Sequence, residues 1–131
     1  MKDQALTKTI IGCAYKVHNT LGAGFLEKVY ENALALELHK ADLTVVQQAP
    51  IQVRYDGEIV GEYCADLWVN QCVIVEIKAV RTLHRQHEVQ LVNYLTATGT
   101  DTGLLINFGE SVQVKRKFRE YKKRQDKKRQ D

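Results

Sequence analysis

The sequence predicts an α/β (α+β) fold, in which a central mixed sheet is flanked by helices and the element order is α-α-β-β-β-α-β. Apolar residues recur at three- and four-residue steps as far as residue 41, which is the period of two amphipathic helices. From Leu43 the pattern changes to strands, and the dipeptide Asp56-Gly57 is a strong hairpin signal. Three antiparallel strands followed by a crossover helix and another strand make a mixed sheet.

Each element also has a local signal. Glycine is the usual residue after a helix, so Gly22 and Gly24 separate the first helix from the second. Pro50 cannot donate a hydrogen bond to a strand ladder, so it indicates an edge strand or a bulge. We expect helices over residues 6–21, 25–41 and 87–98, strands over 44–55, 58–68, 73–80 and 103–108, and a last strand over 111–118.

Length and composition predict one domain over residues 1–118. Of the 131 residues, 44% are apolar and 27% are charged, which is typical of a soluble globular protein. No apolar run approaches the roughly 18–20 residues of a membrane span, and the N-terminus lacks the apolar segment of a signal peptide. Cys13, Cys64 and Cys72 are odd in number and lie in apolar patterns, so we expect reduced, core or half-buried thiols in a cytoplasmic protein.

Basic residues are concentrated at the C-terminus. Residues 115–131 hold 10 of the 19 Lys and Arg and 3 of the 16 acidic residues, which leaves the rest of the chain mildly acidic. We interpret residues 119–131 as a basic tail, flexible or helical, that could bind nucleic acid, although a solvated terminus that only aids solubility is the alternative. The candidate contacts are Lys115, Arg116, Lys117, Arg119, Lys122, Lys123 and Arg124.

Two predicted strands bring charged residues into an apolar sheet. Glu76 and Lys78 alternate with apolar neighbours and therefore project from the same face of their strand. Asp66 falls opposite residue 75 or 76 if the turn between the strands takes two or three residues. Buried charges are costly unless they are paired or bound to a metal, so the cluster predicts either a Mg²⁺ or Mn²⁺ site or a Lys78 salt bridge. The carbonyl of Ile77 is a natural third metal ligand.

The stretch Gly24-Phe25-Leu26-Glu27-Lys28-Val29-Tyr30 places glycine, glutamate and tyrosine at intervals of three residues. Further motifs follow in a fixed order along the chain: Val17-His18, Arg54-Tyr55-Asp56-Gly57, Ala65-Asp66-Leu67, residues 75–80, Gln90-x₃-Tyr94-Leu95 and residues 103–109. Over roughly residues 5–118 the chain resembles the GxxExxY proteins, a family similar to the PD-(D/E)XK nuclease superfamily. The resemblance implies a restriction-endonuclease-like core, with the motif set of its RecB and lambda-exonuclease-like branch. Ala65 stands where a strict version of that motif has proline.

The resemblance also implies roles for the charged cluster. Asp66 and Glu76 would hold Mg²⁺, for which Mn²⁺ could substitute, and the Ile77 carbonyl would complete the protein ligands. Lys78 would position the attacking water. Glu27 would reach the metal directly or through water.

Other residues would assist. Gln90 would orient Lys78 or a water, and Tyr94 would contact the phosphate backbone or support Gln90. His18 and Tyr30 also belong to the family pattern, and packing with a satisfied hydroxyl is the simpler role for them.

The expected function is a Mg²⁺-dependent nuclease that hydrolyses phosphodiester bonds of nucleic acid, DNA rather than RNA, by a metal-activated water. Two alternatives stay open. One is a nucleic-acid-binding module on a nuclease fold, and the other is a regulatory subunit that acts only with a protein partner. A homodimer is compatible with each of them.

Overall fold

The computed structural model of the chain describes residues 3–119. Its elements are α1 (Gln4–Leu21), α2 (Glu27–Lys40), β1 (Val45–Tyr55), β2 (Glu58–Val69), β3 (Val73–Lys78), α3 (Arg85–Thr98), β4 (Thr102–Phe108) and β5 (Val112–Phe118). The predicted order of helices and strands is confirmed, including the last strand. Residues 120–131, and with them the candidate contacts Lys122, Lys123 and Arg124, lie outside the described part of the chain.

The five strands of the described region form one mixed sheet in the order β1-β2-β3-β4-β5. The pairs β1–β2, β2–β3 and β4–β5 are antiparallel, and β3–β4 is parallel. A parallel pair needs a crossover connection, and α3 supplies it between β3 and β4. The predicted α/β (α+β) architecture is therefore confirmed.

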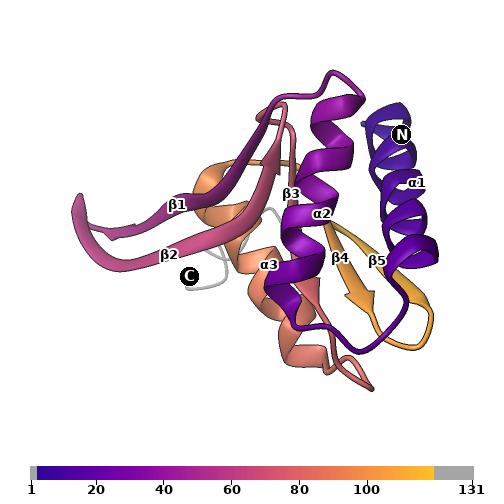
Figure 1. Ribbon diagram of the computed structural model, residues 1–131. Coiled ribbons are helices and arrows are strands. Elements are labelled where there is room, and N and C mark those ends of the chain that lie inside the picture. Colours follow the sequence, from indigo (N-terminus) through magenta and orange to yellow (C-terminus); the bar gives the residue numbers. More distant parts are fainter. Residues whose placement is uncertain (1–2, 120–131) are drawn as a thin grey trace.

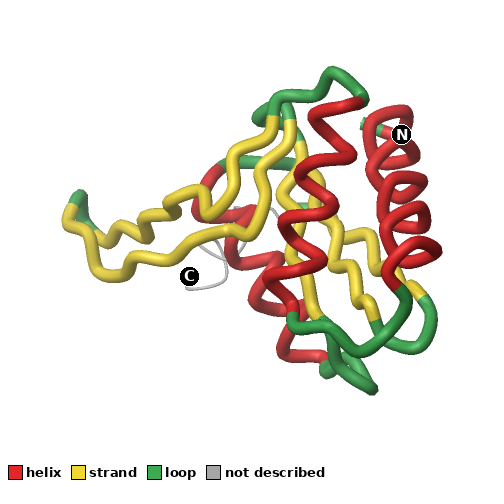
Figure 2. The backbone as a smooth tube through the Cα atoms, in the orientation of Figure 1, coloured by secondary structure: helices red, strands yellow, loops and turns green. Residues whose placement is uncertain are grey.

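Helices cover both faces of the sheet, with α1 and α2 on one side and α3 on the other (Figures 1 and 2). The central strand β3 contributes to both cores because its side chains alternate. Val73, Val75 and Ile77 pack with residues of α1 and α2, whereas Ile74 packs with residues of α3. Glu76 follows the parity of Ile74, so it projects toward α3.

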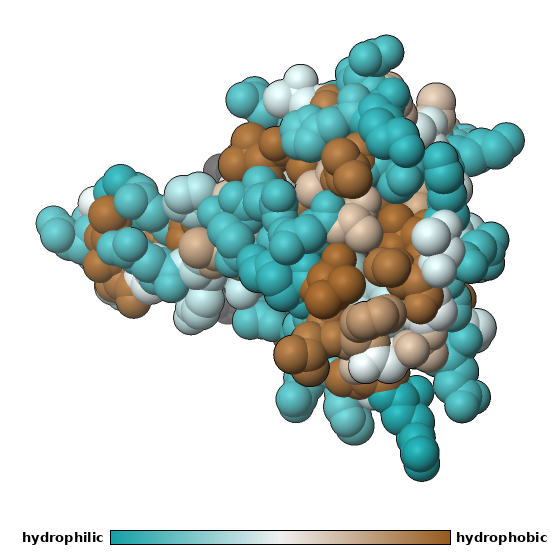
Figure 3. Space-filling model, viewed as in Figure 1, coloured by the Kyte–Doolittle hydropathy of each residue, from teal (hydrophilic) through white to brown (hydrophobic). Residues whose placement is uncertain are grey.

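The outer part of the β1–β2 hairpin extends beyond the rest of the sheet (Figure 1). Pairing between β2 and β3 involves only Leu67, Trp68 and Val69 of β2, and residues 58–65 pair with β1 alone. We refer to residues 50–64 as the hairpin arm. Large hydrophobic side chains are exposed on it: Tyr55, Ile59, Val60 and Tyr63. Figure 3 shows brown, apolar atoms on the projecting part of the molecule.

Several boundaries and burial states differ from the sequence-based expectations. β3 ends at Lys78 rather than at residue 80, and α3 begins at Arg85 rather than at His87. Cys64 and Cys72 are exposed, so the expectation of core or half-buried thiols was wrong for both. Cys64 lies on the hairpin arm, and Cys72 lies in the turn between β2 and β3. Cys13 is half-buried as expected, and β1 is the edge strand that Pro50 indicated.

Candidate active site

Asp66 and Glu76 meet where β2 and β3 separate. The backbone pairing of β2 with β3 ends at Leu67 and Val75. Beyond this pair, the side-chain carboxylate on each strand accepts a hydrogen bond from a backbone N–H of the facing strand. The backbone N–H of Asp66 donates to Glu76 Oε2 at 2.8 Å, and the N–H of Ile77 donates to Asp66 Oδ2 at 2.8 Å. The two acids therefore lie opposite each other, in the arrangement that a three-residue turn at residues 70–72 predicts.

The Ile77 carbonyl faces the same gap. In a strand, the N–H and C=O of one residue leave the same edge. Because the Ile77 N–H points to the Asp66 carboxylate, its carbonyl also points toward β2 rather than toward β4. Two carboxylates and one carbonyl thus border the space between β2 and β3.

Burial makes this acidic pair electrostatically unfavourable. Glu76 is only 7% exposed, and burial, followed by the negative charge of Asp66, raises its pKa to about 8. Burial also raises the pKa of Asp66, although the Ile77 N–H opposes the shift by stabilising the carboxylate. At neutral pH and without a cation, Glu76 is therefore mostly protonated.

Lys78 lies beside the pair without being fixed by it. Its charge lowers the pKa of both Asp66 and Glu76, yet within residues 3–119 it forms no ion pair. The segment after Lys78 is anchored, because the buried Asn107 side chain bonds both the N–H and the carbonyl of Val80 at 2.9 Å. The Lys78 salt bridge considered from the sequence is absent from this part of the chain.

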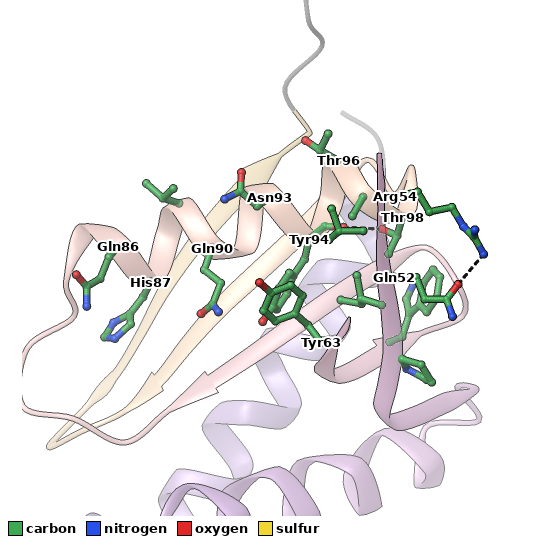
Figure 4. A pocket seen from close by; sticks show the side chains of 16 residues that line it. Gln52, Arg54, Tyr63, Gln86, His87, Gln90, Asn93, Tyr94, Thr96 and Thr98 are labelled. Carbon is green, nitrogen blue, oxygen red and sulfur yellow. Dashed lines mark hydrogen bonds between the residues drawn. The ribbon is translucent and has the colours of Figure 1, made fainter. Parts of the chain in front are cut away.

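Tyr94 and Gln90 reach the site from α3. Burial and then the charge of Glu76 raise the pKa of Tyr94 to about 12, which places its hydroxyl near that carboxylate. Gln90 lies one turn earlier, and both side chains point from α3 toward the sheet (Figure 4). The structure therefore brings Asp66, Glu76, Lys78 and Tyr94 together, and Gln90 lies one turn before Tyr94 on the same face of α3.

Glu27 occupies a different position from these residues. It lies in the first turn of α2 and is exposed. Burial lowers the pKa of His87 on α3, and the nearby charge of Glu27 partly opposes that shift. Among residues 3–119, no group of three His, Cys, Asp or Glu side chains has the geometry of a metal site. A direct bond from Glu27 to a metal held by Asp66 and Glu76 is therefore not prearranged.

Glu31 is the third carboxylate of the site, and the sequence analysis did not select it. It is 4% exposed, and its charge contributes to the raised pKa of both Asp66 and Glu76. Lys28 forms an ion pair with it at 3.2 Å, and Gln47 and Gln48 donate to it at 2.9 and 3.0 Å. One feature of the sequence could have identified Glu31: it lies one turn after Glu27, on the same stripe of the helix as the buried Tyr30 and Leu34.

Gln48 connects this carboxylate with the acidic pair. Its amide donates to Glu31 Oε1 at 3.0 Å and to Asp66 Oδ1 at 3.4 Å. Its φ of 53° lies in the left-handed region, which is uncommon for glutamine within a strand. No sequence pattern predicted that conformation, which the surrounding contacts maintain at the site.

His18 and Tyr30 have packing roles. His18 Nε2 donates to the Gly109 carbonyl at 2.8 Å. Tyr30 is fully buried, and its hydroxyl donates to the Gly22 carbonyl at 2.6 Å and accepts the Phe25 N–H at 3.2 Å. The Tyr30 bonds fix the loop that precedes α2, whereas the His18 bond joins α1 to the turn between β4 and β5.

The candidate basic contacts of β5 do not form one patch. Arg116 donates to Thr7 of α1, whereas Lys117 forms an ion pair with Glu88 of α3 at 2.7 Å. Arg119 forms an ion pair with Asp101 at 2.7 Å. Of the four described candidates, Lys115 is exposed and has no ion pair within residues 3–119.

The mixed sheet, with an acidic pair where its central strands separate, is a restriction-endonuclease-like fold. A family model for the PD-(D/E)XK nuclease superfamily matches residues 4–120, and the chain belongs to that superfamily. Its members are nucleases, whose substrate is nucleic acid, and they typically use divalent metal ions. No curated protein matches the chain. Within the described residues, no helix is both long and apolar enough to cross a bilayer.

Two solved structures share the fold at low sequence identity. The crystal structure of SSO0001 has a TM-score of 0.60 and 16% identity, and the match covers 72% of this chain and 50% of that one. The chain thus spans half the length of SSO0001. An alkaline exonuclease, LHK-Exo from Laribacter hongkongensis, has a TM-score of 0.54 and 11% identity, and the match covers 92% of this chain and 72% of that one.

Proposed function

We propose that the protein is a Mg²⁺-dependent nuclease that hydrolyses phosphodiester bonds, with DNA as its substrate and Asp66, Glu76 and Lys78 as its central residues. The observation that carries the proposal is the buried acidic pair, which lies next to a lysine that forms no ion pair in the described region. A protein that only binds nucleic acid gains nothing from two adjacent carboxylates, because they repel phosphate.

The donor set fits a hard divalent cation. Glu76 Oε1 accepts no hydrogen bond from the described residues, and Asp66 Oδ1 accepts only the long 3.4 Å contact from Gln48. Together with the Ile77 carbonyl, these oxygens would hold Mg²⁺, or Mn²⁺ in its place. Mg²⁺ commonly uses one or two carboxylates and completes its coordination with water and substrate phosphate, so a three-side-chain cluster is not required.

A bound divalent ion would supply Lewis acidity, which polarises the phosphate and lowers the pKa of a water molecule. The remaining steps belong to the side chains. Lys78 Nζ would donate to the attacking water or to a phosphate oxygen, and its charge would stabilise the negative charge that develops on the phosphate. Gln90 would orient the same water through its amide, and the neutral Tyr94 hydroxyl would donate to a phosphate oxygen.

Glu31 and Gln48 would act by positioning. The Gln48 amide holds Asp66 Oδ1 at one end and Glu31 Oε1 at the other, so the rotamer of Asp66 is restrained before any ligand binds. Preorganised ligands need less rearrangement during the reaction. Glu27 would interact with the metal through water, as its exposed position permits.

A cleavage assay tests the proposal. Purified protein is incubated with Mg²⁺ or Mn²⁺ and with linear duplex, single-stranded, nicked and branched DNA, and RNA strands are included for comparison. Wild type should cleave at least one substrate, and Lys78→Ala should lower the rate at least about 100-fold, the usual cost of removing a group that stabilises charge in a transition state.

Lys8→Ala is the matched control, because Lys8 is an exposed lysine of α1 on the opposite face of the sheet. It should cleave at the wild-type rate. Equal rates for wild type and Lys78→Ala, or no cleavage of any substrate, would refute the proposal for the isolated chain.

A further inference from the structure

A long groove runs between α3 and the hairpin arm. Its volume is about 1200 Å³, which exceeds the roughly 300–1,000 Å³ of sites for drug-sized ligands. One wall is the α3 face that carries Gln86, His87, Gln90 and Tyr94, and the other consists of residues 50–54 of β1 with Tyr63 and Trp68 of β2. Figure 4 shows Tyr63 of the hairpin arm next to Tyr94 of α3. The groove is therefore large enough for several nucleotides rather than for one small molecule.

The groove leads to the acidic pair. Trp68 and Tyr94 line it, and Trp68 lies two residues after Asp66 on β2, so the two side chains leave the same face of that strand. Burial and then the charge of Glu76 raise the pKa of Tyr94, in agreement with this proximity. A chain that lies in the groove would thus pass beside the residues proposed to cleave it.

The lining favours bases over phosphates. It includes no carboxylate, and its single arginine, Arg54, is already bonded to the Gln52 amide oxygen and the Gly57 carbonyl, each at 3.1 Å. It therefore has no row of free cations to follow a phosphate backbone. Amide groups instead match the donors and acceptors on base edges.

Aromatic rings complete this chemistry. Tyr63 is 49% exposed and lies 5.7 Å from Tyr94, ring centre to ring centre, at an angle of 41°. Exposed tyrosine rings bind unpaired bases by stacking, without preference for sequence. A duplex keeps its bases stacked on one another, so it could not stack them on these rings.

We propose that this groove binds the unpaired bases of single-stranded nucleic acid and delivers the strand to the Asp66–Glu76 site. The inference rests on the proposed nuclease function and specifies its substrate form. Stacking on the exposed Tyr63 ring and hydrogen bonds from the amides of the groove supply the affinity. The substrate is then a single strand or an unpaired end, rather than continuous duplex.

Fluorescence anisotropy in EDTA tests this binding separately from cleavage. The probes are a labelled oligo(dT) of about 12 nucleotides, within the range that one strand-binding groove covers, its duplex with oligo(dA), and a strand of the same length made of abasic residues. The abasic strand keeps every phosphate and lacks every base. Oligo(dT) should bind at least about tenfold more tightly than either of the other probes, and equal affinity for the abasic strand or the duplex would overturn the inference.

Matched variants locate the binding on the groove. Tyr63→Ala should weaken oligo(dT) binding about 5- to 100-fold, the range expected for loss of base stacking on one ring. Tyr55→Ala is the control, because Tyr55 is an exposed tyrosine of the same hairpin arm outside the groove lining. Asn93→Ala in the groove, compared with Asn19→Ala on α1, gives a second pair, and circular dichroism checks the folding of all four. Equal effects within both pairs would contradict the inference.

Cleavage data distinguish this inference from the function on which it depends. Mg²⁺-dependent cleavage with no preference for single-stranded binding would overturn the groove assignment alone. Single-strand binding through Tyr63 without any cleavage would support the groove and count against the nuclease proposal.

Discussion

Replacing Glu76 by glutamine should stabilise the metal-free protein at neutral and alkaline pH. Burial and the charge of Asp66 raise the pKa of Glu76 from an ordinary 4.5 to about 8, so folding favours its protonated form. The stability contributed by that proton is complete below about pH 4.5 and is lost as the pH rises toward 8. Glutamine keeps an oxygen that can accept the Asp66 N–H, and it carries no charge.

The shift sets the size of the effect. One pKa unit corresponds to about 1.4 kcal/mol. Relative to a neutral side chain, the ionisable Glu76 therefore lowers the free energy of unfolding by about 3 kcal/mol at pH 7, about 5 kcal/mol at pH 9 and about 1 kcal/mol at pH 5. A gain of about 3 kcal/mol should raise Tm by roughly 10 °C in a chain of this length. The same substitution should abolish stabilisation by Mg²⁺, because a neutral amide replaces a carboxylate ligand.

Thermal or urea unfolding in EDTA at pH 5, 7 and 9 measures this pH dependence. Glu62→Gln is the matched control, because Glu62 is an exposed glutamate on the same strand, β2, that carries Asp66. It should change the free energy of unfolding by less than about 0.5 kcal/mol at every pH. A Glu76→Gln gain that does not grow between pH 5 and pH 9 would show that the acidic pair is not under electrostatic strain.

Three further results are expected. Tyr30→Phe should destabilise the protein by about 1–3 kcal/mol in urea unfolding, because it leaves the Gly22 carbonyl and the Phe25 N–H without their partner. The control Tyr15→Phe, at an exposed tyrosine of α1, should leave the free energy of unfolding unchanged. The affinity for Mg²⁺, measured by calorimetry, should rise from pH 6 to about pH 8 and then level off, because the Glu76 proton must leave before the cation binds. A pH-independent affinity would contradict Glu76 as a ligand. Removing residues 120–131 should weaken oligonucleotide binding at low salt and leave it unchanged at high salt, and equal affinities of the full and shortened chains at low salt would exclude a role for those basic residues.

Local patterns predicted the elements and their order well. Amphipathic periods and the Asp56-Gly57 turn are properties of short stretches, and the short turn between the two strands limited the partner of Asp66 to residue 75 or 76. The start of α3 was less accurate, because its first turn is closed by an unusual contact. The His84 N–H donates to His87 Nδ1 at 3.3 Å, and this pairing lies outside the usual preference for Ser, Thr, Asp or Asn at a helix start.

Burial and backbone conformation at several positions depend on tertiary contacts, so local sequence patterns could not predict them. Glu27 and Glu31 are one turn apart on α2, and only packing of the helix on the sheet determines that Glu31 is the buried carboxylate. The left-handed conformation of Gln48 depends on contacts with two other elements. Cys64 has the alternating pattern of a covered strand, but its side chain is exposed, whereas Ile51 of the same arm is buried with residues of α3.

The central claim is that Asp66 helps to hold a divalent cation that is required for phosphodiester hydrolysis. Its most direct test is the initial cleavage rate of a labelled DNA strand as a function of Mg²⁺ concentration, for wild type, Asp66→Asn and Asp42→Asn. Asp42 is exposed and has a left-handed backbone that asparagine tolerates well, so it is the control. The account predicts saturable, EDTA-sensitive cleavage by wild type and Asp42→Asn, and none by Asp66→Asn. Cleavage by Asp66→Asn with the same Mg²⁺ dependence as wild type would contradict it.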